Sequence, residues 1–553
     1  MQGARRRVPG HAYRVAPDRP VAPDVDGGDL HGGSVRRARV IGVAHPFRTR
    51  QTPTGNRAAR RPPPAMFENR MPRYEPLGGD DLEALDRGWE RLVADVGIRF
   101  DHPEARRLLA EAGQAVDGDV VRLDPAFLRA QLALAPRAFT LAARNPERSL
   151  EIGGDAMVFC AAQGPPFVRR GDERRDGTFE DFRRLVMMVQ ASGVLDTPGR
   201  NVVEPNDLPL DIRHLMRAQA MIRLTDLVWS GEPSSTVAAE DCLRMAEIVF
   251  GGREAIERQP VIFANCNVNS PLNFDERMLE GILAYAGAGQ AVIITPFLLM
   301  GAMAPVSVPA ALVQQTAEVL AGVALVQLIR PGTPCVMGSF LSSTDMKTGS
   351  PAFGGPESAF GLYASGQIAR RLGIPWRSGG GTLTASPAVD FQAGYEAFNT
   401  LASAFLAGAN VCWQTAGWLE GGLVTSFEKF AADVELLDLL QHQFTPVRIT
   451  DETIAFDAHA EVGHAGHFFG AAHTLERFRD CFWRPSVGTT DNFDRWTRAG
   501  RPDHAARASA RVDELLEAYE RPPLDAGLEA ELIEFVERRA RELGDPVEAG
   551  LLD

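Results

Sequence analysis

The sequence predicts an α/β protein whose main domain is a TIM (β/α)8 barrel, with an N-terminal helical cap and C-terminal helices. Short apolar runs alternate with helical patterns between about residues 146 and 460, and eight such runs occur. Helical periodicity dominates on both sides of this region. A doubly wound open sheet would give a similar alternation, so it is the number of strands that favours the barrel.

The segments before the barrel differ in composition. Residues 1–70 are rich in arginine, proline and glycine and lack a long apolar run, which predicts a disordered basic head rather than a secretory signal. Residues 71–145 place apolar side chains at helical spacing, as at Leu82, Leu85 and Trp89, which predicts a helical cap. Within the cap, residues 118–124 predict a strand and Pro125 predicts the start of a helix.

The barrel is predicted for residues 146–460, and residues 461–553 are predicted to form a helical extension packed on it. The predicted strands are 156–162, 200–204, 227–230, 260–266, 291–296, 334–339, 374–379 and 410–415. The predicted helices between them include 211–223, 238–249, 312–329, 357–372 and 395–406, and two more are predicted at 505–521 and 528–543. These helices are long enough to connect parallel strands.

Composition limits the class of protein and its partners. A hydrophobic fraction of 45% and a charged fraction of 24% are ordinary for a soluble globular protein. The net charge is −14 although residues 1–65 hold 13 arginines and 4 aspartates, so the body is acidic and nucleic acid is not an expected partner. Pro296, Gly301 and Pro305 interrupt the apolar run at 290–307, and no membrane span is expected. The six cysteines are widely spaced, as is typical of a reduced, cytoplasmic protein.

Candidate site residues lie in the loops that follow the predicted strands, because the carboxyl ends of barrel strands meet at one mouth. The most informative stretch is 376–435, with its glycine-rich loop and the helix start at Ser426. The polar candidates are Gln163, Asn206, Asp390, Gln392, Gln414 and Glu420, and the aromatic candidates are Phe297, Phe353, Trp376, Trp413 and Trp418. Gly379, Gly380 and Gly381 are candidates for contact with a cofactor.

The chemistry of these candidates favours a cationic ligand. The mouth holds few groups for proton transfer, whereas aromatic faces with nearby carboxylates suit a quaternary ammonium group. Core packing is the alternative for the tryptophans, above all for Trp413 within a strand. The histidines His459, His464, His467 and His473 match no zinc spacing, so no metal site is predicted and a metal-dependent hydrolase is the weakest alternative. Neither a dinucleotide-binding GxGxxG motif nor a P-loop follows a predicted strand.

Several ordered segments together resemble the trimethylamine methyltransferase family, corrinoid-dependent barrel enzymes that demethylate methylated amines and betaines. The resemblance spans most of residues 80–543. It is carried by VGIRFDHPEARRLLAEAG (96–113), APRAFTLAARNPERSLEIGGD (135–155), VVEPNDLP (202–209), TDMKTGSPAFGGPESAFGLYASGQIARRLGIPWRSGGG (344–381), DFQAGYE (390–396), GWLEGGLVTSFEKFAADVE (417–435) and GHFFGAAHTLERF (466–478).

The resemblance implies transfer of a methyl group from nitrogen to the reduced cobalt of a corrinoid, which a separate small protein carries to the barrel mouth. In the trimethylamine enzymes pyrrolysine is thought to assist, and this sequence contains none; its expected position is near 378–392. Members without pyrrolysine resemble glycine-betaine methyltransferases, so a quaternary amine is the expected substrate. Trimethylamine is one alternative, and a non-catalytic barrel that binds quaternary amines is another. A homo-oligomer is expected.

Specific roles for the candidates follow from this interpretation. Glu420 and Asp390 are expected to face the cationic head as catalytic groups, and Trp418 and Trp376 to form its walls. The amide side chains of Gln163, Asn206 and Gln414 are expected to hold a substrate carboxylate or the edge of the corrinoid.

Overall fold

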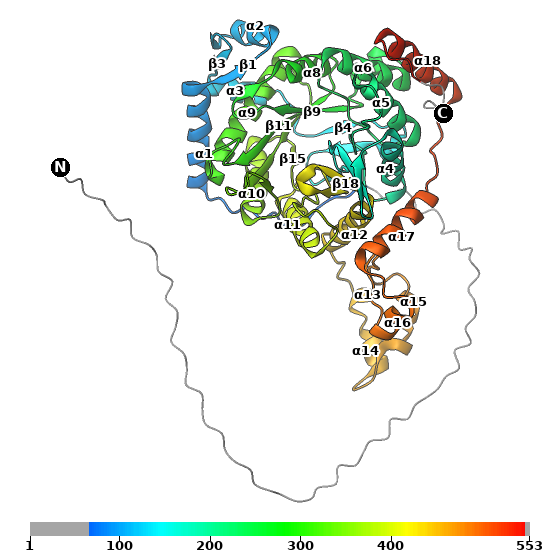
Figure 1. Ribbon diagram of the computed structural model, residues 1–553. Helices are drawn as coiled ribbons and strands as arrows, with labels where there is room; N and C mark the ends of the chain where they lie inside the picture. The colour runs from blue at the N-terminus through cyan, green and yellow to red at the C-terminus, as the bar shows by residue number, and fades with distance from the viewer. Residues whose placement is uncertain (1–65, 548–553) are drawn as a thin grey trace, which may run out of the picture. The chain divides into compact units, whose positions relative to one another are not determined.

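The computed structural model describes residues 66–547 (Figure 1). The predicted basic head, up to residue 65, therefore lies outside the described residues. The barrel, the cap and the C-terminal helices all lie within the described residues.

A ring of parallel strands forms the centre of the fold. Neighbouring strands pair in the order β9, β11, β12, β15, β16 and β6. Their bounds are Phe263–Val268, Ala291–Met300, Cys335–Gly338, Trp376–Ser378, Val411–Cys412 and Val158–Phe159, respectively. Two further positions close the ring, because Thr197 pairs in parallel with Cys160 and Ser230 pairs in parallel with Phe263. The Ser230 amide donates to the Gly199 carbonyl at 2.9 Å. The predicted eight-membered barrel is confirmed.

One predicted strand was wrong in position. The chain occupies the second barrel position around Thr197, and residues 200–204 belong to the loop that follows it. Val202 and Val203 are buried there, and the Val202 carbonyl accepts a hydrogen bond from the Thr425 hydroxyl at 2.7 Å. The loop is thus as apolar as a strand because it is covered, and its composition misled the prediction.

Helices surround the strands on the outside (Figure 1). They are α4 (Phe179–Ser192), α5 (Arg213–Leu224), α6 (Thr236–Phe250), α7 (Arg253–Arg258), α8 (Glu276–Gly287), α9 (Val308–Ile329), α10 (Pro356–Leu372), α11 (Phe391–Ala407) and α12 (Phe427–Gln443). Helix α9 is long and apolar enough to cross a membrane by composition, but most of it is buried against β11 and the cap helices. It is therefore a core helix.

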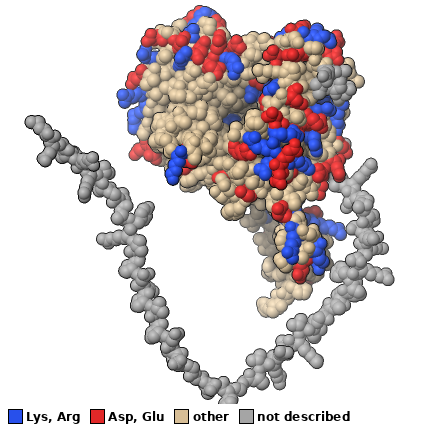
Figure 2. Space-filling model, in the orientation of Figure 1, with Lys and Arg blue, Asp and Glu red and all other residues tan. Residues whose placement is uncertain are grey.

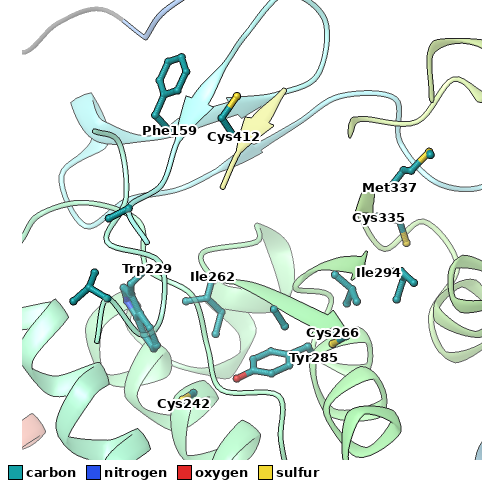
Figure 3. Close-up of a cluster of buried hydrophobic side chains, with 14 of the residues drawn as sticks. Phe159, Trp229, Cys242, Ile262, Cys266, Tyr285, Ile294, Cys335, Met337 and Cys412 are labelled. Atoms are coloured by element: carbon teal, nitrogen blue, oxygen red, sulfur yellow. The ribbon is translucent and has the colours of Figure 1, made fainter. Parts of the chain in front are cut away.

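The alternation of side chains along each strand separates two cores. Outward-facing residues such as Phe159, Cys266, Ile294 and Met337 pack between the strands and the helices, where Tyr285 of α8 joins them (Figure 3). Inward-facing residues form a second cluster that fills the lower barrel; its buried members include Val158, Val228, Phe263, Ile293, Val336, Val411 and Trp413.

The floor of the barrel is closed by a hairpin. Strands β4 (Phe139–Leu141) and β5 (Leu150–Ile152) pair antiparallel, and Leu141, Leu150 and Ile152 pack into the inner cluster. Access to the barrel interior is therefore from the opposite end, where the strands have their carboxyl termini.

The N-terminal cap contains both helices and short strands. Its elements are α1 (Gly79–Arg91), a π-helical turn η1 (Leu92–Val96), β1 (Ile98–Phe100), α2 (Pro103–Glu111), β2 (Ala115–Asp117), β3 (Val120–Arg122) and α3 (Pro125–Leu132). The predicted strand near 118–124 and the helix start at Pro125 are confirmed. Strand β10 (Asn273–Phe274), from the loop after β9, pairs parallel with β1 and joins the cap to the barrel.

A small sheet lies on the open face of the barrel. Strands β7 (Phe167–Arg170) and β8 (Glu173–Asp176) come from the loop after β6, whereas β17 (Trp418–Leu419) and β18 (Val424–Ser426) come from the loop after β16. Parallel pairing of β18 with β7 connects the first and last barrel strands over the mouth. The loop after β12 adds β13 (Phe340–Thr344) and β14 (Pro351–Ala352), and short 3-10 turns are η2 (Pro146–Arg148), η3 (Leu210–Ile212) and η4 (Glu420–Gly422).

The C-terminal part begins earlier than predicted, because α12 ends at Gln443 rather than near residue 460. Residues 444–500, here called the arm, form α13 (Asp451–Ile454), α14 (Phe456–Val462), η5 (Phe468–Gly470), α15 (Ala472–Arg477) and α16 (Phe493–Arg498). The arm extends away from the barrel (Figure 1). Helix α17 (His504–Glu517) returns to pack on α12 and α4, and α18 (Ala526–Glu542) packs on α5 and α6.

Candidate active site

Aromatic side chains from several strand ends converge at the mouth. The mouth cluster consists of Phe297 at the end of β11, Phe340 at the start of β13, Phe353 and Leu383 in loops, and Trp418 in β17. The ring centroids of Phe340 lie 4.7 Å from Phe297, 5.8 Å from Phe353 and 6.2 Å from Trp418. Four aromatic rings from different loops therefore pack against one another at the carboxyl ends of the strands, and aromatic groups of this kind can recognise a cation.

Trp418 owes its position to the glycines that follow it. A Cβ atom at Gly422, where φ is +97°, would lie 2.4 Å from the Trp418 ring. The ring packs edge-on against Phe353 at a centroid distance of 5.7 Å. Its Nε1 atom is buried and finds no acceptor among the described residues. The loop AGWLEGG is therefore shaped around this indole, as its glycines suggested.

Below the cluster the barrel interior becomes polar. Asn265 of β9, Thr295 of β11 and Arg377 of β15 are at inward-facing positions, since their neighbours in sequence face the outer core. The Thr295 hydroxyl donates to Asn265 Oδ1 at 2.7 Å, and Asn265 Nδ2 donates to Asn267 Oδ1 at 3.1 Å. Gly338 faces the same layer, and a Cβ there would lie 2.2 Å from Thr295 Oγ1. We call this set of inward-facing residues the polar layer.

The polar layer is reached from the mouth. Asn265 is half-buried and Asn267 is exposed, although Ala264 and Cys266, which face the helices, are fully buried. The inner side of β9 is thus open to solvent from above. The mouth rim is also strongly charged on one side, since Figure 2 shows basic and acidic side chains gathered over β7, β8 and β18, where the basic ones are arginines.

A buried ionic network holds the rim next to β6. Arg217 lies between two carboxylates, with Nη1 3.0 Å from Glu204 Oε2 and Nη2 2.7 Å from Glu232 Oε2. Arg200 and Arg213 bind the remaining oxygens of Glu232 and Glu204 at 2.9 and 3.1 Å. Burial opposes ionisation of Glu232, but the charges of Arg200 and Arg217 outweigh it and lower its pKa to about 2. Each carboxylate is bound by two of the three arginines, so the network, which keeps a net charge of +1, is scaffolding.

The predicted amide side chains are used within the protein. Gln163 Oε1 accepts from the amides of Arg200 and Asn201, each at 2.8 Å, and its Nε2 donates to the Pro198 carbonyl at 2.8 Å. Gln414 Oε1 accepts from the Gln163 amide at 2.5 Å. Asn206 Nδ2 donates to the Pro166 carbonyl at 2.7 Å. The structure brings Gln163 and Gln414 together, but as a tie between the loops after β6 and β16.

The predicted acidic residues also have partners. Glu420 is paired with Arg174 of β8, with Nε 3.0 Å from Oε2. Asp390 is the N-cap of α11, where Oδ1 accepts from the Ala393 amide at 2.9 Å. Gln392 Nε2 donates to Glu396 at 3.0 Å. These contacts give all three residues a role in holding loops and helix ends.

The predicted tryptophans divide between three environments. Trp418 is in the mouth cluster together with the predicted Phe297 and Phe353. Trp376 faces outward, where its Nε1 donates to Ser339 Oγ at 2.8 Å and its ring borders Gly366 of α10. Trp413 faces inward in the lower barrel, with its ring centroid 5.3 Å from that of Phe263. Only Trp418 of the three is therefore placed to form a wall of the mouth.

The three consecutive glycines are buried, so the structure gives them a packing role rather than contact with a cofactor. None of them has the positive φ that the sequence suggested. A Cβ at Gly379 would lie 2.8 Å from the Ser339 carbonyl oxygen, and one at Gly380 would lie 2.7 Å from Leu362. At Gly381 it would lie 2.1 Å from the Gln414 carbonyl oxygen. Close approach of neighbouring strand ends requires these glycines.

The histidines are remote from the mouth cluster. In the arm the rings of His459 and His467 pack against Phe468 and Phe469, with centroids 5.4 and 5.8 Å apart. Within residues 66–547 no three His, Cys, Asp or Glu side chains are grouped so that they could hold a metal ion.

The family model for trimethylamine methyltransferase (MTTB) matches residues 47–544. The chain belongs to the trimethylamine methyltransferase family. Among similar proteins is the glycine betaine methyltransferase of Desulfitobacterium hafniense (strain Y51), 37% identical over 476 residues, which are 86% of this chain and 99% of that protein. Another is the proline betaine:corrinoid methyltransferase of Eubacterium limosum, 27% identical over 483 residues, 83% of this chain and 96% of that protein.

Trimethylamine methyltransferases of the same family are also similar. The enzyme of Desulfitobacterium hafniense (strain DSM 10664 / DCB-2) is 27% identical over 474 residues, 84% of this chain and 94% of that protein. Among solved structures, the Methanosarcina barkeri monomethylamine methyltransferase superposes with a TM-score of 0.49 and 10% identity, covering 82% of this chain and 90% of that one.

Among the residues of the site that were not identified from the sequence are Phe340 and Arg377. Phe340 follows directly on a predicted strand, in the run CVMGSF, and is the hub of the mouth cluster. Arg377 is a charged residue inside a predicted strand, flanked by Trp376 and Ser378. A charge at the middle of a short buried strand is itself an unusual signal, since arginine is rarely fully buried without a partner.

Proposed function

We propose that this protein transfers a methyl group from a betaine-like quaternary amine to the cobalt of a corrinoid carried by a separate protein. The observation that carries this proposal is the mouth cluster, where Phe297, Phe340, Phe353 and Trp418 surround the entrance to the barrel. Membership of the family and the similarity to betaine methyltransferases support it.

The charge behind the cluster suits a cation. Glu396 of α11 is buried, and its carboxylate accepts from Thr384 Oγ1 at 2.6 Å and from the Ala385 amide at 2.9 Å. No Lys, Arg or His nitrogen in residues 66–547 is within 4.0 Å of it. Its Cβ and Cγ atoms border Gly354, next to Phe353 of the cluster. A carboxylate left without a direct counter-ion beside aromatic faces favours a positively charged substrate.

The reaction needs alignment more than proton transfer. The methyl carbon accepts an electron pair from the reduced cobalt while the electrons of the C–N bond return to nitrogen. A neutral tertiary amine therefore leaves without gaining or losing a proton. The residues of this chain hold the nitrogen among the aromatic rings, so that one methyl group points out of the mouth. The carboxylates at the rim are held in ion pairs, which agrees with a reaction that requires no general acid.

The corrinoid is a substrate brought by a partner, and the mouth must admit it. The exposed Asn267 and the half-buried Asn265 mark the open side of the barrel interior. The charged rim over β7 and β8 provides Arg169, Arg170, Arg174 and Arg175 for orienting a docked protein. We propose a small corrinoid-binding protein as this partner.

Methyl transfer to a corrinoid protein tests the function directly. Purified protein is mixed with a reduced corrinoid protein and with glycine betaine, choline or trimethylamine, and methylation is followed by the visible absorbance of the corrinoid. Methylation with a quaternary amine is expected. Methylation of the corrinoid with trimethylamine and with no quaternary amine would show that trimethylamine, not a betaine, is the substrate. Tight calorimetric binding of quaternary amines with no methylation would favour a non-catalytic binding protein instead.

We also propose that the protein is a homo-oligomer, because the arm lacks a core of its own. Within the arm the buried apolar side chains are Ala458, Ala471, Val487 and Phe444, and the Phe444 ring packs on Phe405 of α11 rather than on the arm. Six phenylalanines there are 43–83% exposed, namely Phe456, Phe468, Phe469, Phe478, Phe482 and Phe493. At about 150–250 Å² for a fully accessible aromatic side chain, they leave on the order of 800 Å² uncovered, about what one partner contributes to a stable interface.

Sedimentation velocity tests the oligomer. Wild-type protein is expected to sediment as a multimer, and a double variant Phe469→Ser, Phe482→Ser in the arm is expected to dissociate. Phe391→Ser, on the exposed start of α11, is the matched control and should leave the multimer intact. A wild-type monomer at micromolar concentration would contradict the proposal. A cytoplasmic location is proposed as well, since all six cysteines are free thiols.

A further inference from the structure

Arg377 carries a positive charge that no neighbouring carboxylate balances. Its side chain is at an inward-facing position of β15 and is 2% exposed. Nη1 donates to the Ser339 carbonyl at 3.1 Å, and the guanidinium lies 5.4 Å from the centroid of the Trp413 ring. Its Nε is buried without an acceptor, and no Asp or Glu oxygen in the described part of the chain is within 4.0 Å of it.

This arrangement is costly for the protein alone. A buried charge without a partner destabilises a folded protein by several kcal/mol, so such groups are usually paired. The other fully buried cation near the mouth, Lys429, illustrates the usual solution through its ion pair with Asp433. Burial lowers the pKa of Arg377 to about 10, which still leaves it protonated at neutral pH. The free positive charge is therefore a permanent property of the barrel interior.

One other residue of the polar layer can donate to an anion. Asn265 Nδ2 has two N–H groups and gives one of them to Asn267, whereas the hydroxyl hydrogen of Thr295 is already donated to Asn265 Oδ1. Because Asn265 is half-buried and Asn267 exposed, an anion can enter the layer from the mouth.

The guanidinium also binds the segment of chain that leads into the mouth cluster. The carbonyl that it binds belongs to Ser339, the residue before Phe340. A ligand with a quaternary nitrogen among the rings and an anionic group a few bonds away can therefore reach both. Glycine betaine has this form, since one methylene separates its nitrogen from its carboxylate.

We propose that Arg377 binds the carboxylate of the substrate and makes the site selective for zwitterionic betaines over quaternary amines that lack a carboxylate. This inference rests on the proposed function and names the substrate class of the same site. The carboxylate points toward the polar layer, so the N-methyl groups point toward the mouth, where the acceptor approaches. Arg377 thus orients the substrate as well as selecting it.

A purely structural role for Arg377 gives a different expectation. If the guanidinium served only to bind the Ser339 carbonyl and the Trp413 ring, its replacement by methionine would destabilise the protein and weaken every ligand alike. If it is kept for a ligand, removal of an unpaired buried charge leaves the stability equal or higher. The stability of the unliganded Arg377→Met variant is therefore the first readout.

The second readout is ligand binding, measured by calorimetry with the full-length protein and without corrinoid. The probes are glycine betaine and tetramethylammonium, which share a quaternary head and differ in the carboxylate. Arg377→Met is expected to weaken the binding of glycine betaine about 10- to 100-fold and the binding of tetramethylammonium less than about 2-fold. Arg377→Lys keeps the charge but loses the planar guanidinium, so its affinity for glycine betaine is expected to lie between those of the wild type and Arg377→Met. Equal losses for both probes, or no loss for glycine betaine, would overturn the inference.

A measurement on the wild-type protein covers the case in which Arg377→Met does not fold. Glycine betaine and its methyl ester have the same quaternary head, but the ester has no negative charge. The wild-type protein is expected to bind glycine betaine at least about 10-fold more tightly than the ester. Equal affinities would overturn the inference without any variant.

These outcomes are separable from those of the proposed function. Carboxylate-dependent binding through Arg377 with no methylation of a corrinoid would support this inference and contradict the proposed function. Methylation of the corrinoid from tetramethylammonium that is as efficient as from glycine betaine, and that Arg377→Met leaves unchanged, would support the proposed function and contradict this inference.

Discussion

Arg174 and Glu420 join two loops across the barrel mouth. The Nε atom of Arg174, in β8, lies 3.2 and 3.0 Å from the two carboxylate oxygens of Glu420. The same guanidinium covers the ring of Phe167 at 3.9 Å. The amide of Glu420 donates to the Ser386 carbonyl at 3.0 Å, so three loops meet at this residue. The Glu420 carboxylate therefore connects loops at the rim, and Arg174 already balances its charge.

Glu420→Gln follows from this pairing. The pair is partly exposed, and such ion pairs contribute about 0–1 kcal/mol. We expect the variant to bind a quaternary amine within about threefold of wild type, because the substrate charge is not met by Glu420. Calorimetry with glycine betaine measures this. A loss of more than tenfold would return Glu420 to the role of counter-charge that the sequence suggested.

Trp418→Leu removes one wall of the mouth cluster. A cation over an aromatic face gains about 0.5–2 kcal/mol, so we expect affinity for a quaternary amine to fall roughly 2- to 30-fold. Trp376→Phe is the matched control, because this indole lies outside the barrel wall. It should lose about 1 kcal/mol of stability with its hydrogen bond to Ser339 and leave binding unchanged. If Trp376→Phe weakened binding of the quaternary amine and Trp418→Leu did not, Trp418 would not be a wall of the site.

Gly381→Ala tests the close approach behind the mouth. The added Cβ would lie 2.1 Å from the Gln414 carbonyl oxygen, and backbone atoms cannot move aside as a flexible side chain can. We expect a loss of about 1–3 kcal/mol or more in the free energy of unfolding, measured in urea. Gly394→Ala, on α11 with no atom within 4 Å of its new Cβ, should instead gain about 0.5–1 kcal/mol. Similar stabilities for the two variants would be inconsistent with this geometry.

The stability contributed by Glu232 should depend on pH. Its pKa falls from 4.5 to about 2 on folding, so the folded state favours the carboxylate. The contribution is complete above about pH 4.5 and is lost as pH falls toward 2, and it amounts to on the order of 3 kcal/mol. Glu232→Gln should therefore be less stable than wild type at pH 7, and the gap should narrow below pH 4.5. A gap that stays constant down to pH 3 would show that the ion pairs do not matter.

Much of the fold could be predicted because the pattern of apolar residues along the chain depends on which faces of each element are buried. The runs 291–296 and 334–339 are apolar throughout, since parallel strands are covered on both faces, and they are β11 and β12. The second strand was misplaced because the covered loop with Val202 and Val203 has the same composition. The end of the barrel near Gln443 was missed because the arm is rich in apolar residues that this chain leaves exposed.

The site was harder to predict than the fold. Position after a strand correctly brought Phe297, Phe353 and Trp418 together, because strand ends meet at one mouth. It could not distinguish inward from outward side chains, since a shift of one residue exchanges them: Trp376 faces the helices and Arg377 the interior. Nor could it reveal which polar groups the protein uses itself, because the partners of Gln163 and Asp390 are set by tertiary contacts.

The nearly complete burial of α9 has a consequence for biosynthesis. This helix packs on α1, α2, α3, α8 and β11, all of which precede it in the chain, whereas α10 follows it. When its apolar surface leaves the ribosome, most of the surfaces that cover it have already been made. Once α9 has been made, we expect a nascent chain without the cap to be captured by chaperones more often than one with the cap intact.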